Sequence, residues 1–348
     1  MTETSLADLG WSAHFSDQTG PDALLATPPA RISDIHRDQV LAKPADGDLT
    51  LDLPPEMRAG DLAVGDLVLS DPGLGRVHAL FERRTVLRRR TEGSGDKRQL
   101  IAANIDTLLI VSSCNADFNP ARLERYLALA ISSAIAPAMV LTKADMTTDA
   151  DDYRTKARSL LGDMPVIVLD ARDPASLDQL LPFVKTGQTA ALVGSSGVGK
   201  STIMNGLAGI ETLTQGIREN DAKGRHTTTA RSLRRTTSGS WLVDTPGMRS
   251  LSMSDNAEGI ETLFADLIEL TAGCKFSDCS HNMEPGCAVQ AAIKKGDLDP
   301  DRLQRWLKLA SENQGNTETP AEARARIRGQ SHHIRSATKK KRPRPADS

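Results

Sequence analysis

The hydrophobic pattern changes twice along the 348 residues, and its first part alternates with a period of two. Between residues 31 and 100, short alternating segments such as DLTLDL and GDLVLS are separated by turn signals such as DPGLG. Short strands at this spacing are typical of a small β-barrel. Residues 1–30 show no periodicity, so we expect them to form a flexible lead-in.

Strands and helices alternate over residues 101–252. The run DTLLIVSS is apolar throughout, as in a strand that is buried on both faces. Asn119 and Pro120 have the character of an N-cap and a first helical residue, and the helical pattern ARLERYLALAISS follows them. With the later strands PAMVL, PVIVL and TAALV, this series predicts a mostly parallel α/β sheet covered by helices.

Residues 253–315 have a helical pattern around a cysteine cluster, and residues 316–348 form a basic tail that we expect to be disordered. No apolar run is long enough to span a membrane, and the first residues lack the features of a secretory signal. We therefore expect a cytoplasmic protein without a membrane partner. We also expect it to be a monomer.

The segment GSSGVGKST matches the phosphate-binding pattern G-x-x-x-x-G-K-[ST] and stands between a predicted strand and a predicted helix. Glycines allow backbone N–H groups to turn toward phosphate oxygens, and the N-terminus of the helix adds partial positive charge. We expect Lys200 to bind the β- and γ-phosphates and Ser201 to bind Mg²⁺. The predicted nucleotide-binding residues here are Gly194, Ser195, Ser196, Gly197, Val198, Gly199, Lys200, Ser201 and Thr202.

The segment DTPG ends a predicted strand downstream of this loop. We expect Asp244 to anchor Mg²⁺ and the backbone of Gly247 to contact the γ-phosphate. The intervening GRHTTTA is typical of a mobile switch, in which Thr228 is our choice to complete the Mg²⁺ shell, with Thr227 and Thr229 as alternatives.

The residue after DTPG bears on hydrolysis. Ras-type enzymes place a glutamine there to orient the attacking water, whereas this chain has Met248, which cannot do so. His226 in the switch segment is the polar candidate to replace it, and Lys200 and Thr228 complete the predicted catalytic set. The alternative for His226 is contact with RNA or solvent.

The motif TKAD, formed by Thr142, Lys143, Ala144 and Asp145, follows another predicted strand. A carboxylate such as that of Asp145 can accept two hydrogen bonds from guanine that adenine cannot donate, and the stem of Lys143 can lie over the base. This base motif precedes the phosphate loop by about fifty residues, the reverse of the usual order. Because parallel strands end at one edge of a sheet, both motifs can still bind one nucleotide in a circularly permuted domain.

Four potential metal ligands lie within fourteen residues in the pattern C-x4-C-x-H-x5-C. Three thiolates and one imidazole at this density predict a closed, structural zinc site without a catalytic role. The predicted ligands are Cys274, Cys279, His281 and Cys287. The remaining cysteine, Cys114, follows a buried strand, and we interpret it as a packed thiol.

The net charge of −2 conceals two basic segments. Residues 321–348 hold nine Lys and Arg against two acids, and residues 83–98 hold seven against two. Local basic patches of this kind indicate contact with a polyanion. Aromatic residues make up only 3%, so we expect ERRTVLRRR on the barrel to bind RNA through its backbone, while the tail either adds affinity or solubilises the chain.

The motifs and their order resemble the RsgA family of circularly permuted GTPases, also called YjeQ or YloQ. The resemblance covers about residues 30–310 and is carried by IAANID, TKAD, GSSGVGKST, GRHTTT, DTPG and the cysteine cluster. It implies an OB-type barrel, a central P-loop GTPase domain and a C-terminal zinc domain. It also implies GTP hydrolysis stimulated by the small ribosomal subunit during late maturation. Thr142 replaces the family's asparagine, and Asp170 replaces a serine that supports guanine binding.

These features suggest three candidate functions. The first is a GTPase that binds the small subunit and its rRNA through the barrel and the zinc domain. The alternative is a guanine-nucleotide switch that signals to a protein partner off the ribosome, which needs no RNA-binding barrel. The third is an RNA-binding scaffold with a structural nucleotide, which Lys200, Ser201 and Asp244 argue against.

Overall fold

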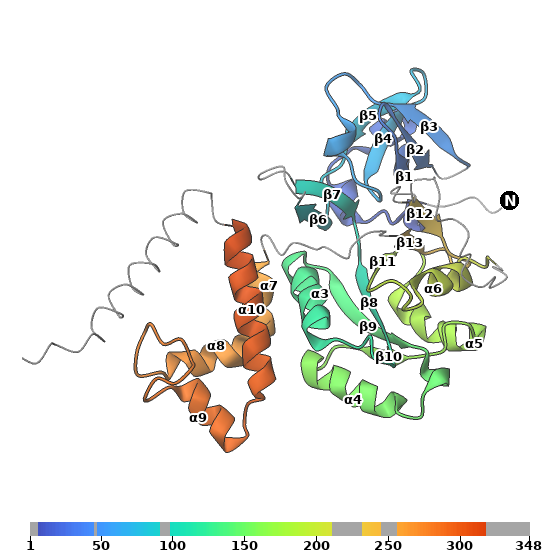
Figure 1. Ribbon diagram of the computed structural model, residues 1–348. Coiled ribbons are helices and arrows are strands. Elements are labelled where there is room, and N and C mark those ends of the chain that lie inside the picture. The colour runs from blue at the N-terminus through green and yellow to red at the C-terminus, as the bar shows by residue number, and fades with distance from the viewer. Residues whose placement is uncertain (1–5, 45–46, 91–97, 211–231, 245–255, 318–348) are drawn as a thin grey trace, which may run out of the picture. The chain divides into compact units, whose positions relative to one another are not determined.

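The computed structural model describes residues 6–44, 47–90, 98–210, 232–244 and 256–317 (Figure 1). The chain divides into two compact units, Met1–Ser252 and Met253–Ser348. The first unit contains a β-barrel, a two-stranded ribbon and an α/β sheet, and the second is helical. Among the described residues, no helix is both long and apolar enough to cross a membrane.

The N-terminal segment is structured, and the prediction of a flexible lead-in is wrong for its described part. Three short helices precede the barrel: η1 (Leu6–Leu9), α1 (Ala13–Ser16) and α2 (Pro21–Ala26). Phe15 is fully buried with Leu67, Leu69 and Phe81. The ring of Trp11 meets that of Phe81 edge to face, with 5.1 Å between the ring centroids. Helices of four to six residues are too short to show a helical period, which explains why the sequence pattern missed them.

Five strands close into a barrel in the order β1-β2-β3-β5-β4. The strands β3 and β5 pair in parallel, and the remaining neighbours pair antiparallel. Alternate apolar side chains, including Ile32, Val40, Leu51 and Val68, fill the interior. The elements are β1 (Pro29–Ile35), β2 (Gln39–Lys43), β3 (Leu49–Asp52), η2 (Ala59–Asp61), β4 (Leu67–Asp71) and β5 (Arg76–Leu80). The small OB-type barrel predicted from the sequence is confirmed.

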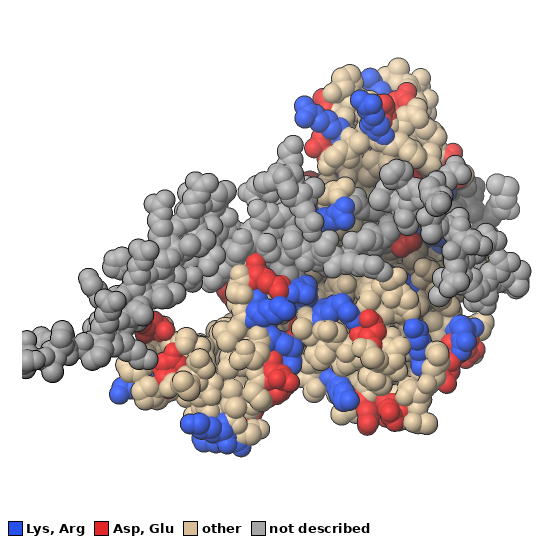
Figure 2. Space-filling model, viewed as in Figure 1, with Lys and Arg blue, Asp and Glu red and all other residues tan. Residues whose placement is uncertain are grey.

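The basic segment after the barrel differs from the prediction. β6 (Val86–Arg90) pairs with β7 (Arg98–Ala103) in a separate two-stranded ribbon, so ERRTVLRRR is not a barrel strand. Arg83 and Arg84 in this segment form ion pairs at 2.7 and 2.8 Å with Asp66 and Asp106. Figure 2 shows blue and red side chains interspersed over the visible described surface, without one continuous basic area.

The central sheet has six strands in the order β10-β9-β8-β11-β13-β12, of which only β12 runs antiparallel. Helices cover both faces, with α3 and α4 on one and α5, η4 and α6 on the other (Figure 1). The strands are β8 (Thr107–Ser113), β9 (Ala136–Thr142), β10 (Val166–Val168), β11 (Thr189–Val193), β12 (Ser232–Arg235) and β13 (Trp241–Asp244). The helices are α3 (Pro120–Ser132), η3 (Ala144–Met146), α4 (Ala150–Leu161), α5 (Pro174–Leu177), η4 (Asp178–Phe183) and α6 (Lys200–Leu207).

A buried arginine joins the barrel to this sheet. Arg31 in β1 donates hydrogen bonds to the carbonyl oxygens of Leu9 and Asn104 and to the hydroxyl of Thr189, the first residue of β11. Complete burial lowers the pKa of its guanidinium to about 10, because desolvation disfavours the charged form. The barrel is thereby attached to the strand that leads into the phosphate loop.

Within residues 256–317, the second unit has four helices around a small apolar core. They are α7 (Ala257–Leu263), α8 (Ala265–Ala272), α9 (Ala288–Lys295) and α10 (Pro300–Thr317). Helix α10 packs on α7 and α8 packs on α9, and Phe264, Leu267 and Val289 are fully buried. The connection between α8 and α9 carries the cysteine cluster.

Candidate nucleotide-binding site and metal centre

A cavity of about 430 Å³ opens at the carboxyl ends of the parallel strands. Its walls include Asp145 of the base motif together with Lys200 and Ser201 of the phosphate loop. The base motif follows β9 and the phosphate loop follows β11, with β8 between the two strands. Two segments that lie in inverted order along the chain therefore face one cavity, and its volume suits a small-molecule ligand.

The phosphate loop has the backbone conformation that its glycines allow. Gly194, with φ of 145°, approaches the sheet so closely that an added Cβ would stand 2.2 Å from the carbonyl oxygen of Val111. Gly199 also has a positive φ of 96° and directly precedes α6. The Lys200 ammonium donates hydrogen bonds to the carbonyl oxygens of Gly194 and Ser195, at 2.9 and 2.6 Å, which holds the loop curled. The loop and the helix N-terminus form a cradle suited to phosphate.

Thr142 connects the base motif to the phosphate loop. Its side chain is fully buried, and its hydroxyl lies 2.6 Å from the carbonyl oxygen of Val198 and 3.2 Å from that of Ser112. The threonine that replaces the usual asparagine thus supplies a direct hydrogen bond between the two motifs. The next residue, Lys143, adopts the left-handed conformation with φ of 59°, which non-glycine residues adopt mainly where surrounding structure holds them.

The base end of the cavity contains a residue that the sequence analysis did not select. Arg172 follows β10, and its guanidinium forms ion pairs with Asp145 and, at 3.3 Å, with Asp170. The backbone N–H of Arg172 also donates to the Asp170 carboxylate at 2.9 Å and lowers the pKa of that carboxyl. The signal for Arg172 was present, because VLDARD places it just beyond a buried strand at the same sheet edge.

Asp117 is a second residue of the site that the sequence analysis did not select. It lies in the loop between β8 and α3, and its carboxylate accepts a hydrogen bond from the Ser195 hydroxyl at 2.8 Å. The guanidinium of Arg122 in α3 pairs with the same carboxylate at 2.9 Å. The second residue of the phosphate loop is therefore held from the adjacent strand tip.

The predicted magnesium ligands are described only in part. Asp244 is the last residue of β13 and lies opposite Leu192 in β11, so its strand ends beside the start of the phosphate loop. Ser201 lines the cavity. The other predicted participants, His226, Thr228 and Gly247, lie outside the described residues.

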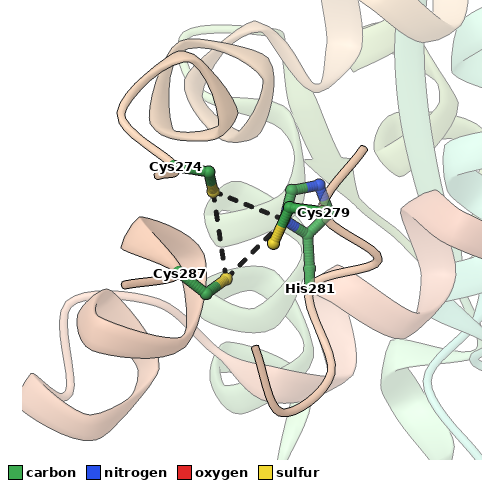
Figure 3. Close-up of side chains that lie close together, drawn as sticks. All are labelled: Cys274, Cys279, His281 and Cys287. Carbon is green, nitrogen blue, oxygen red and sulfur yellow. Dashed lines mark hydrogen bonds between the residues drawn. The ribbon is translucent and has the colours of Figure 1, made fainter. Parts of the chain in front are cut away.

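The second unit holds a compact group of metal-ligating atoms. Cys274, Cys279, His281 and Cys287 each offer one donor atom, and these atoms lie within 4.8 Å of one another (Figure 3). Cys274 stands just after α8 and Cys287 directly before α9. His281 has a left-handed φ of 57°, and its carbonyl accepts a hydrogen bond from the Gln290 side chain at 2.6 Å.

The separations in this group fit a tetrahedral metal site. The Sγ atoms of Cys274 and Cys287 are 3.9 Å apart, and they lie 3.6 and 3.7 Å from Nδ1 of His281. Zinc at ordinary bond lengths separates two thiolates by about 3.8 Å and a thiolate from an imidazole nitrogen by about 3.6 Å. Although desolvation opposes it, hydrogen bonds from the backbone N–H groups of Ala288 and Val289 lower the pKa of Cys274, whereas desolvation raises the pKa of Cys279 to about 11.

The chain is similar to known proteins over most of its length. The family model described as RsgA GTPase matches residues 80–254. A protein of Mesorhizobium japonicum, "Small ribosomal subunit biogenesis GTPase RsgA", is 54% identical over 90% of this chain and 91% of its own length. "Small ribosomal subunit biogenesis GTPase RsgA 2" of Vibrio vulnificus is 44% identical over 93% of this chain and 92% of its own length.

Solved structures share the fold. The crystal structure of YjeQ from Thermotoga maritima superposes with a TM-score of 0.60 at 24% identity, covering 82% of this chain and 98% of that one. That of YloQ, described as a circularly permuted GTPase, gives a TM-score of 0.56 at 24% identity, covering 84% and 97%. The match of the family model and the identity to these relatives over nine tenths of the chain show that the chain belongs to the RsgA GTPase family.

Proposed function

We propose that this chain hydrolyses GTP while bound to the small ribosomal subunit, during late maturation of that subunit in the cytoplasm. The observation that carries the proposal is the cavity that Asp145 and Lys200 share. It offers a carboxylate for a guanine base at one end and a phosphate cradle at the other. Relatives that match over nine tenths of the chain are named small ribosomal subunit biogenesis GTPases, which supports the choice of partner.

Each end of the cavity has a defined role in this proposal. Asp145 accepts two hydrogen bonds from guanine, and the stem of Lys143 covers the base. At the other end, Lys200 exchanges its bonds to loop carbonyls for bonds to the β- and γ-phosphates. Ser201 and Asp244 would hold Mg²⁺, and the ion would supply positive charge beside the phosphates. From the segments outside the described residues, Thr228 completes the Mg²⁺ shell, Gly247 contacts the γ-phosphate and His226 orients water.

The remaining domains bind the subunit. We assign residues 31–100 to an RNA-binding barrel with its ribbon, 101–252 to the GTPase domain, 253–315 to a zinc domain and 316–348 to a basic tail. Zinc is the metal we propose for the Cys3His group, because its separations and ligand types suit that ion. The three thiolates and the imidazole would supply four ligands to the metal, so the metal would hold the α8–α9 connection and would take no part in hydrolysis.

GTP turnover with and without purified small subunits tests the proposal. We expect stimulation by the subunit, and we expect the affinity of the chain for subunits to fall steeply with salt, because phosphate contacts release counterions. Turnover that subunits leave unchanged, together with tight GTP binding, would instead favour the guanine-nucleotide switch acting on a protein partner. The internal pairing of Arg83 and Arg84 is the observation that keeps this alternative in view, since it removes two cations from the proposed RNA surface.

A further inference from the structure

The carboxylate that we propose to bind guanine already has a partner in the structure. Arg172 donates a hydrogen bond from Nη2 to Oδ2 of Asp145, and both side chains line the cavity. Guanine needs both oxygens of such a carboxylate, one for its ring N–H and one for its exocyclic amine. The guanidinium therefore occupies an acceptor that the base requires.

A second carboxylate, that of Asp170, also pairs with Arg172. The guanidinium lies 3.3 Å from the Asp170 carboxylate through Nε, and the Arg172 backbone N–H donates to that carboxylate as well. Releasing Asp145 thus leaves Arg172 paired with Asp170 instead of unpaired in solvent. The Arg172 side chain is not enclosed by the protein, because 61% of its surface is exposed.

We propose that Arg172 competes with guanine for Asp145 and thereby sets the rate and affinity with which the chain takes up guanine nucleotides. In the nucleotide-free protein Arg172 bridges Asp145 and Asp170. An entering base takes over Asp145, and Arg172 stays with Asp170. This inference rests on the proposed function, since it takes Asp145 as the base-binding residue.

The effect is a modest one by its nature. Exposed ion pairs contribute little to stability. In the wild-type chain, the need to break this pair therefore slows the association of guanine nucleotides and weakens their binding by no more than about fivefold. The pair is screened by salt, so the effect shrinks as ionic strength rises. Removing a positive charge near an anionic ligand acts in the opposite direction, so faster uptake by a neutral variant cannot come from long-range attraction.

Stopped-flow binding of the fluorescent nucleotide mant-GDP to Arg172→Gln tests the proposal in the full-length chain. We expect association up to about fivefold faster than in wild type at low salt, an unchanged dissociation rate, and convergence of the two proteins near 1 M salt. Arg154→Gln is the matched control, because Arg154 forms a comparable exposed ion pair with Asp151 on α4 outside the cavity, and its association rate should equal that of wild type. Equal thermal unfolding of the three proteins shows that the comparison concerns the site.

Two results overturn the inference. An unchanged association rate shows that Arg172 does not compete, and faster dissociation with weaker binding shows that it contacts the bound nucleotide. Asp145→Asn separates these failures from failure of the proposed function. If that variant keeps wild-type affinity for mant-GDP, Asp145 does not bind the base and both proposals fall. If it loses affinity while Arg172→Gln behaves as wild type, only the competition is refuted.

Discussion

The hydroxyl of Thr142 should couple the base motif to the phosphate loop, and Thr142→Val tests this with little change of shape. The hydroxyl is the donor to the Val198 carbonyl at 2.6 Å, inside a fully buried environment. Valine removes the donor and leaves a buried carbonyl without that bond. A net hydrogen bond contributes about 1 kcal/mol, and an unsatisfied buried group costs about 1–3 kcal/mol. We therefore expect the first unit to lose about 1–3 kcal/mol of stability.

The same change should weaken nucleotide binding, because Val198 belongs to the phosphate loop. If the nucleotide must restore the loop geometry that the hydroxyl held, about 1 kcal/mol of binding free energy is lost, which is about fivefold in Kd. Urea unfolding and mant-GDP titration measure the two effects. Thr155→Val is the matched control, since the Thr155 hydroxyl donates only to the Asp151 carbonyl on the exposed face of α4.

If Thr142→Val has the same free energy of unfolding and the same mant-GDP affinity as wild type, the hydroxyl does not couple the base motif to the phosphate loop. Loss of stability with unchanged affinity would restrict the hydroxyl to a structural role.

The remaining predictions concern the barrel, the metal and the switch. Arg83→Met should destabilise the first unit by about 3–5 kcal/mol in urea unfolding, because it leaves Asp66 buried and unpaired, and adding Asp66→Asn should restore most of the loss. Burial raises the pKa of Asp66, so folded Arg83→Met binds a proton that its unfolded chain releases. The stability of Arg83→Met should therefore recover as pH falls from 7 toward about 4. A stability that does not change with pH would contradict this. Chelation, or Cys287→Ser, should remove one zinc per chain and abolish the helical circular dichroism of the second unit, while mant-GDP affinity stays unchanged. The control Cys114→Ala should retain the metal. His226→Ala should lower subunit-stimulated turnover by about 10²-fold or more and spare GTP affinity, and undiminished turnover would exclude His226 as the water-orienting group.

Much of the fold follows from local pattern and from the geometry of parallel strands. The N-cap at Asn119 was predicted from the Asn-Pro pair, and its side chain accepts a hydrogen bond from the Arg122 N–H at 3.0 Å. The shared cavity was expected because the ends of parallel strands meet at one edge, whatever order the chain visits them in. These features depend on residues close in sequence or on a rule of sheet topology.

The features that were missed depend on contacts between distant segments. Phe15 is buried because Phe81 and two barrel residues surround it, and no periodicity in a four-residue helix reveals this. The sequence suggests that Arg83 and Arg84 bind RNA, whereas the structure shows that both pair with carboxylates of the same chain. The sequence places Arg172 just beyond a predicted strand at the same sheet edge, but it does not show that the guanidinium pairs with Asp145.

A competition titration tests most directly whether Asp145 and Lys200 bind opposite ends of one guanine nucleotide. Mant-GDP bound to the wild-type chain is displaced with GTP, ATP or xanthosine triphosphate. The titration is repeated on Asp145→Asn with mant-labelled xanthosine diphosphate as the bound probe, because that variant is expected to bind mant-GDP weakly. A site built to hydrogen-bond guanine should prefer GTP over ATP by about 10⁴-fold, and Asp145→Asn should lose GTP affinity and gain affinity for the xanthine nucleotide, which carries a carbonyl where guanine has its amine. Equal displacement by ATP and GTP, or an Asp145→Asn variant that still prefers GTP, would contradict the account.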